Sequence, residues 1–178
     1  NDCTAHMDGA RLFNAAIATG TDPARIVRDY DSVSICLSKG LGAPVGSVLV
    51  GSSDFIALAH RWRKMFGGGM RQAGVIAACG LYAIGNHIER LTEDHEMAHR
   101  LAVAVNSLSN FDVELDSVQS NMVFVRTREG TADKVVEHLA SQGVDILTIN
   151  DSVVRAVTHL HVTDEDIERA ISAFSSMQ

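Results

Sequence analysis

The sequence predicts an α/β protein, in which part of a large α/β domain is followed by a small α+β domain. Residues Ser32–Ser38 alternate apolar and polar side chains, as in a strand with two unlike faces, and lead into Lys39 and a loop rich in Gly and Pro. A second short strand pattern ends at Asp8 and runs into a glycine and a helix. From residue 111 onward, short strand and helix patterns alternate. We therefore expect two domains, over residues 1–109 and 110–178.

The first part contains two predicted helices and a further strand. A helical pattern over residues 10–19 ends at Gly20, which suits the left-handed position that follows a helix. Asp22 is a good N-cap and Pro23 a good first residue for a short helix over 24–29. Residues 47–50 form the next strand. The loop between Lys39 and this strand is too short for a parallel crossover, so we expect it to run antiparallel to the lysine strand.

Capping residues and apolar patterns also predict the remaining elements. Ser52, Ser53 or Asp54 can cap a helix that runs to Met65, and its apolar stripe contains Phe55, Leu58, Ala59 and Trp62. After a glycine-rich joint, two long helices are predicted over 72–91 and 93–108. In the small domain we expect strands near 112–115, 122–126, 145–149 and 153–158, a helix over 132–141, and a last helix capped by Thr163 with Asp166.

Composition excludes several classes of function. The 178 residues include 15 basic and 22 acidic side chains, for a net charge of −7, so nothing favours a nucleic-acid partner. The longest uncharged stretch, Ala73 to Gly85, is too short to span a membrane, and the N-terminus has no signal-peptide pattern. Three widely spaced cysteines indicate neither a disulfide framework nor a zinc ribbon. We expect a soluble, cytoplasmic protein without a membrane or nucleic-acid partner.

Lys39 and Asp8 are the candidate catalytic residues. Each follows a predicted strand, and strand ends meet at one edge of an α/β sheet, where ligands usually bind. A lysine beside closely approaching glycine backbone suits covalent chemistry with a carbonyl group. Each residue also has a simpler interpretation: Lys39 as a solvated lysine at a strand end, and Asp8 as the N-cap of the helix that follows it.

Four segments of the chain resemble one enzyme family. These are HMDGARLFNA (6–15), SICLSKGLGAPVGSVLVG (34–51), RWRKMFGGGMRQAG (61–74) and VVRAVTHLHVT (153–163). They resemble pyridoxal-phosphate enzymes of the aspartate-aminotransferase fold (fold type I), and within them the threonine aldolases. The resemblance implies that Lys39 holds pyridoxal 5'-phosphate covalently and that Asp8 pairs with the nitrogen of its pyridine ring. Residues 1–109 would then be the C-terminal part of the large cofactor-binding domain.

Basic residues complete the site that the resemblance implies. Arg11, which is also placed near the cofactor, and Arg155 correspond to arginines that bind the substrate α-carboxylate, for which a planar guanidinium is well suited. Arg155 could equally be a surface arginine on an edge strand. Lys64 and Arg71 flank a glycine run and, by resemblance, lie near the cofactor phosphate of a neighbouring subunit; otherwise they are solvated helix ends. A homo-oligomer, dimer or tetramer, with shared active sites is therefore expected.

The expected activity is the cleavage of L-threonine or L-allo-threonine to glycine and acetaldehyde. The catalytic base is not identified. The chain starts inside a functional stretch, so we expect a C-terminal fragment that lacks the phosphate-binding loop and the residue stacked on the cofactor ring, and that is inactive or weak alone. The alternatives are a β-eliminating lyase or aminotransferase of the same fold, and a non-catalytic dimerisation module.

A zinc peptidase is the alternative from another class. His95, Glu96 and His99 match the H-E-x-x-H pattern of zinc proteases. However, Ala102 and Val105 stand where the extended pattern needs Gly and His, and the segment carries many charges, as a solvated helix face does. His159 and His161 would share one face of a strand, but two ligands do not make a zinc site. We therefore predict no metal site.

Overall fold

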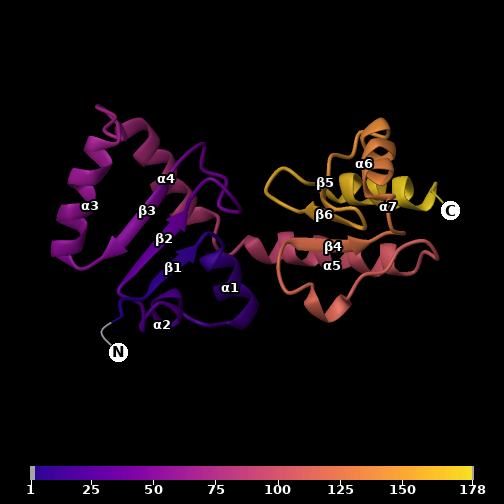
Figure 1. Ribbon diagram of the computed structural model, residues 1–178, viewed down its shortest axis with the longest axis horizontal. Coiled ribbons are helices and arrows are strands. Elements are labelled where there is room, and N and C mark those ends of the chain that lie inside the picture. Colours follow the sequence, from indigo (N-terminus) through magenta and orange to yellow (C-terminus); the bar gives the residue numbers. More distant parts are fainter. Residues whose placement is uncertain (1–2, 178) are drawn as a thin grey trace. The chain divides into compact units, whose positions relative to one another are not determined.

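The computed structural model describes residues 3–177 (Figure 1). The chain divides into two compact units, one up to Arg90 and the other from Leu91 onward. We expected the boundary after residue 109, which would place the helix α5 (Leu91–Asn106) in the first domain. In the structure α5 belongs to the second unit. The reason is its buried face, since Ala98, Leu101, Ala102 and Val105 all belong to the hydrophobic core of the second unit.

A three-stranded sheet organises the first unit. Its order is β1 (His6–Gly9), β2 (Ser32–Cys36), β3 (Ser47–Gly51). β1 runs parallel to β2, with Asp8 opposite Ser34. β3 runs antiparallel to β2, which confirms the expectation from loop length.

Two helices follow β1 and end as the sequence predicts. α1 (Leu12–Thr19) ends at Gly20, whose backbone is left-handed with φ of 61°. Its backbone N–H reaches carbonyl groups of the last turn, which a residue with a Cβ would do only under strain. α2 (Pro23–Ile26) is shorter than predicted and begins with an Asp22 side chain that accepts a hydrogen bond from the Ala24 N–H at 2.7 Å.

The next two helices differ from expectation in burial and length. Ser52 caps α3 (Ser53–Met65) by accepting a hydrogen bond from the Phe55 N–H. No residue of α3 is buried, and Trp62 is 48% exposed, although the apolar stripe predicts a covered face. α4 (Gly74–Asn86) ends before the predicted residue 91, and the next residue, His87, hydrogen-bonds the Leu41 carbonyl through Nδ1 at 2.7 Å.

The second unit packs α5 and α6 (Ala132–Ser141) against an antiparallel sheet, and α7 (Asp164–Ser175) contacts these two helices (Figure 1). The strand order is β4 (Met122–Arg126), β6 (Val153–Val157), β5 (Leu147–Asn150). The strand predicted over 112–115 is wrong. Only an isolated bridge joins Asp112 to Arg126, and a 3-10 turn, Leu115–Ser117, follows.

Alternation along the strands separates a core face from an open face. Val123, Val125, Val154 and Ala156 point into the core, with exposures of 0–6%. The residues between them therefore point the other way. α7 begins with the predicted capping box, in which Thr163 and Asp166 bond each other's backbone N–H groups. Within residues 3–177, no helix is long and apolar enough to cross a membrane.

Candidate active site

Asp8 and Lys39 lie at the same edge of the first sheet. β1 and β2 are parallel neighbours, so their carboxyl ends lie together. Asp8 is the second-last residue of β1, and Lys39 follows the end of β2 by three residues. Both side chains are exposed. The strands thus bring an amine and a carboxylate to the edge where α/β proteins bind ligands.

The backbone around Asp8 shows that it is not the cap of α1. The helix begins at Leu12, its N-cap position is occupied by Arg11, and no side chain caps it. Asp8 Oδ1 instead accepts a hydrogen bond from the Ala10 N–H at 3.1 Å. This bond orders a tight turn after β1 and involves one carboxylate oxygen, so the second oxygen can bind a ligand. Arg11 is half-buried in this turn.

Hydrogen bonds hold the loop that carries Lys39. Gly42 N–H donates to the Lys39 carbonyl at 2.8 Å. Leu37 N–H donates to the Gly46 carbonyl, and the Leu37 carbonyl accepts from Ala43 N–H, each at 3.0 Å. Gly42 and Gly46 have φ of 69° and 115°, which side chains disfavour. Leu37 is buried beneath the loop. The backbone at Lys39 is therefore fixed while its amine stays accessible.

Cys36 is a neighbour of Lys39 that the sequence analysis did not single out. Its Sγ lies 3.4 Å from Ser38 Oγ, at the end of β2. Burial alone would raise the pKa of the Cys36 thiol, but hydrogen bonds from Ser38 and Ser47 and the charge of Lys39 outweigh it, so the pKa is lowered. The sequence did contain a signal for this position, because Cys36 falls among the polar residues of the alternating strand pattern that leads to Lys39.

Lys64 and Arg71 lie on either side of the glycine run, and both are exposed. Lys64 is in the last turn of α3. Its side chain lies over Gly69, where an added Cβ would be 2.7 Å from Lys64 Cδ. Within the described residues, no hydrogen bond or ion pair joins Lys64 or Arg71 to Asp8 or Lys39. Their place at a cofactor phosphate stays a prediction.

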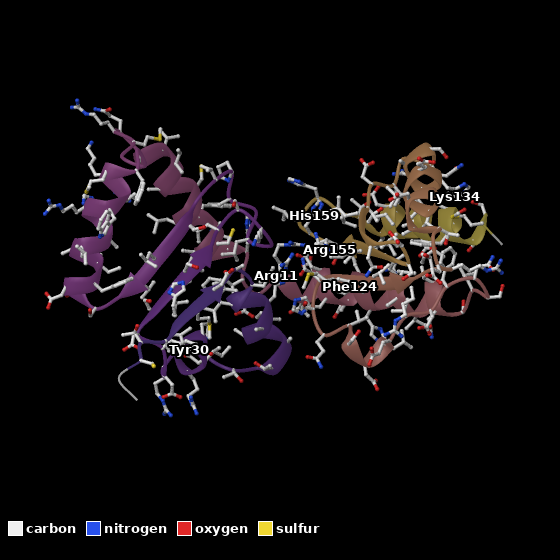
Figure 2. All side chains as sticks on the ribbon, viewed as in Figure 1. Arg11, Tyr30, Phe124, Lys134, Arg155 and His159 are labelled. Carbon is white, nitrogen blue, oxygen red and sulfur yellow. The ribbon has the colours of Figure 1, made fainter. Side chains whose placement is uncertain are left out.

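Arg155 occupies the central strand of the second sheet, so the alternative of an edge-strand arginine is wrong. It is half-buried on the open face, and Figure 2 shows it near Phe124 of β4. The strand register places Leu147 of β5 opposite it on the other side. Arg155 Nε is buried and has no hydrogen-bond partner in the described chain. A buried donor without an acceptor is costly, and because Nε is closed to a ligand, an anion could bind only at the Nη groups.

The histidine pairs do not form a metal site in the described part of the chain. No group of three or more His, Cys, Asp and Glu side chains among residues 3–177 could hold a metal ion. His95 is half-buried in α5, and burial lowers its pKa despite the charge of Asp94. His159 and His161 lie in a turn beyond the end of β6 rather than on a strand.

Comparisons with known proteins agree with this geometry. The family model of the beta-eliminating lyases matches residues 1–128. The low specificity L-threonine aldolase of Escherichia coli K12 is 47% identical over 163 residues, which cover 91% of this chain and 47% of that protein. Low-specificity L-threonine aldolase 1 of Arabidopsis thaliana is 44% identical over 172 residues, covering 95% of this chain and 48% of that protein.

The fold is also found among solved structures. The threonine aldolase of Leishmania major superposes with a TM-score of 0.73 at 20% identity, over 97% of this chain and 51% of that one. The fold is therefore that of pyridoxal-phosphate enzymes of fold type I. The chain spans about half the length of these relatives. With a family model that matches most of its residues, this chain belongs to the beta-eliminating lyase family.

Proposed function

We propose that this chain forms part of the active site of a threonine aldolase that cleaves L-threonine or L-allo-threonine to glycine and acetaldehyde. The observation that carries the proposal is the parallel pairing of β1 with β2, which brings Asp8 and Lys39 to one sheet edge. The identities of 44% and 47% to two low-specificity L-threonine aldolases support this substrate class. The two units would be the C-terminal part of the cofactor-binding domain and the small domain.

The residues at this edge fit pyridoxal phosphate, on which the family depends. Lys39 offers an exposed primary amine that can condense with the cofactor aldehyde. Asp8 offers a carboxylate oxygen outside its local turn. When bound, the cofactor supplies an electron sink for the bond broken at the substrate Cα. Asp8, as a carboxylate, keeps the proton on the pyridine nitrogen and so maintains that sink.

Arg155 would bind and orient the substrate through its α-carboxylate. Its Nε is fully covered, so a carboxylate would bind through the two Nη groups of the planar guanidinium. Arg11, half-buried after β1, would contribute a second positive charge near the cofactor and the carboxylate. Such contacts would orient the substrate by its carboxylate.

The partners would be an amino-acid substrate and further copies of the same protein, in a dimer or tetramer. The support for an oligomer is the exposed apolar surface around the glycine run, where Phe66 and Met70 are 83% and 67% exposed. Lys64 and Arg71 beside it would reach the cofactor phosphate of a neighbouring subunit. The setting would be cytoplasmic, in threonine breakdown and glycine formation.

The test is to locate the lysine that holds the cofactor. The whole protein that carries this chain is mixed with pyridoxal phosphate, reduced with borohydride and digested for mass spectrometry. Lys39, Lys64 and Lys134 are the lysines of this sequence. We expect the label on Lys39 and its loss in Lys39→Ala, with Lys134→Ala as the matched control. A label that stays dominant on Lys64 or Lys134 would refute the assignment.

The products distinguish the remaining activities of the fold. Incubation with L-threonine should release glycine and acetaldehyde in equal amounts. An α-keto acid as the main product would indicate a β-eliminating lyase or an aminotransferase instead. A labelled Lys39 without any turnover would favour the non-catalytic module.

A further inference from the structure

His87 joins the loop that carries Lys39 to the end of the helix α4. Its Nδ1 lies 2.7 Å from the carbonyl oxygen of Leu41, which stands two residues after Lys39 in that loop. A carbonyl oxygen can only accept a hydrogen bond, so Nδ1 carries the hydrogen and donates it. The bond is part-buried, and Leu41 is only 3% exposed. Loss of the donor would therefore leave a partly buried carbonyl without its partner, which is costly.

The same face of α4 also contacts the base of the loop. Gly80 and Ala83 are the buried residues of the helix, and His87 follows its last residue. Residues spaced by three and four positions lie on one face of a helix, so positions 80, 83 and 87 form one stripe. A Cβ added to Gly80 would lie 3.0 Å from Leu37 Cδ1, so the helix backbone lies close to the residue beneath the loop. α4 thus contacts the loop at two points, at Leu37 through Gly80 and at Leu41 through His87.

The His87 imidazole is held in the orientation that this bond needs. The backbone N–H of His87 donates to the Ala83 carbonyl at 2.9 Å, which keeps the residue in register with the helix. Its ring packs edge to face against Tyr82, with ring centroids 5.4 Å apart and planes at 84°. Edge-to-face contacts are a favoured arrangement of aromatic rings, so this one limits rotation of the imidazole. Contacts at the end of α4, and not the loop alone, therefore orient the donor.

The anchored carbonyl belongs to the turn that contains Lys39. Gly42 N–H donates to the Lys39 carbonyl at 2.8 Å, so Leu41 lies inside a short hydrogen-bonded turn. A shift of the Leu41 carbonyl therefore moves the backbone from which the Lys39 amine extends. We propose that His87 is a positioning residue for Lys39, which it holds through the backbone of this turn. This inference rests on the proposed function, because it concerns the place of the lysine that holds the cofactor.

The test compares three variants of the whole protein at saturating pyridoxal phosphate. His87→Leu removes the donor at similar side-chain size, whereas His87→Asn keeps one, because the asparagine Nδ2 takes nearly the place of the imidazole Nδ1. His60→Leu is the matched control, since His60 is an exposed histidine on α3 of the same unit. For His87→Leu we expect kcat with L-threonine to fall about tenfold, since a 1 Å misplacement can cost roughly 100-fold. KM should stay within about twofold, because no residue assigned to the substrate is changed.

Rescue separates the hydrogen bond from the size and packing of the side chain. His87→Asn should keep kcat within about threefold of wild type, because one neutral N–H donor replaces another. His60→Leu should leave kcat unchanged. Unchanged kcat in His87→Leu, or an equal loss of kcat in His87→Asn, would overturn the positioning role.

Hydrogen exchange gives a readout that does not depend on turnover. In the whole protein without cofactor, the peptide that covers residues 37–46 contains the hydrogen-bonded amides of Gly42 and Ala43. We expect these amides to exchange about tenfold faster in His87→Leu, because loss of the anchor favours local opening of the turn. His87→Asn and His60→Leu should exchange at the wild-type rate.

The outcomes distinguish this inference from the proposed function. If borohydride labels Lys39 but His87→Leu leaves the exchange of the loop amides unchanged, the positioning role is overturned and the proposed function stands. If borohydride labels a lysine other than Lys39, the proposed function fails, and the positioning role fails with it, even where exchange shows that His87 holds the loop.

Discussion

Gly9 is the position where a single methyl group should disturb both the fold and the site. It is the last residue of β1 and directly follows Asp8. A Cβ added there would lie 2.8 Å from the Ser34 carbonyl oxygen and 3.0 Å from Val33 Cγ1. The nearer atom is backbone of the neighbouring strand, so it cannot rotate away. Gly9→Ala must therefore push β1 and β2 apart.

The size of the effect follows from these distances. Ordinary van der Waals contact begins at 3.4 Å, so the Cβ and the Ser34 oxygen must separate by about 0.6 Å. Overpacking of this kind costs about 1–3 kcal/mol of unfolding free energy. The same shift moves Asp8, the adjacent residue. Since a 1 Å misplacement can cost roughly 100-fold in rate, we expect turnover to fall about tenfold.

Urea unfolding followed by Trp62 fluorescence measures the first effect, because Trp62 is the one tryptophan of the sequence and lies in the first unit. Threonine cleavage by the whole protein measures the second. Gly85→Ala is the matched control, because nothing lies within 4 Å of the added Cβ. Gly85 lies in the helix α4, where alanine in place of glycine should raise the free energy of unfolding by about 0.5–1 kcal/mol. Gly9→Ala with an unchanged urea midpoint and unchanged turnover would refute the reasoning.

Three further predictions concern the site and its alternatives. Asp8→Asn should keep cofactor binding, measured by absorbance, but lose most turnover, because an amide does not hold the proton on the pyridine nitrogen. Near-normal turnover would contradict the role of Asp8. Cys36 should react with iodoacetamide at a lower pH than an ordinary thiol, because the nearby positive charge of Lys39 favours the thiolate. Lys39→Ala should therefore shift the pH profile of the Cys36 reaction rate to higher pH. An unshifted profile would mean that Lys39 does not act on Cys36. His95→Ala and His99→Ala should keep aldolase activity within a few-fold of wild type, and metal analysis should find no stoichiometric zinc; tightly held zinc would revive the peptidase interpretation.

Much of the local structure could be predicted because its causes are local. Gly20 ends α1, Asp22 opens α2 and Ser52 opens α3, and each acts on backbone only two to four residues away. The direction of β3 followed from loop length alone. The sequence also indicated that Asp8 and Lys39 lie at one sheet edge, since each follows a predicted strand and the strand ends of an α/β sheet meet where ligands bind.

Other features depend on contacts between distant segments. The central position of Arg155 requires β4 and β5 to pair on opposite sides of β6, and residues 122–126 are far from β6 in sequence. The covered Nε, the exposed α3 and the place of α5 in the second unit likewise depend on which surfaces meet. Side-chain patterns show that a face is apolar or charged, but only the tertiary structure decides which neighbour covers it, because burial is a property of pairs of surfaces.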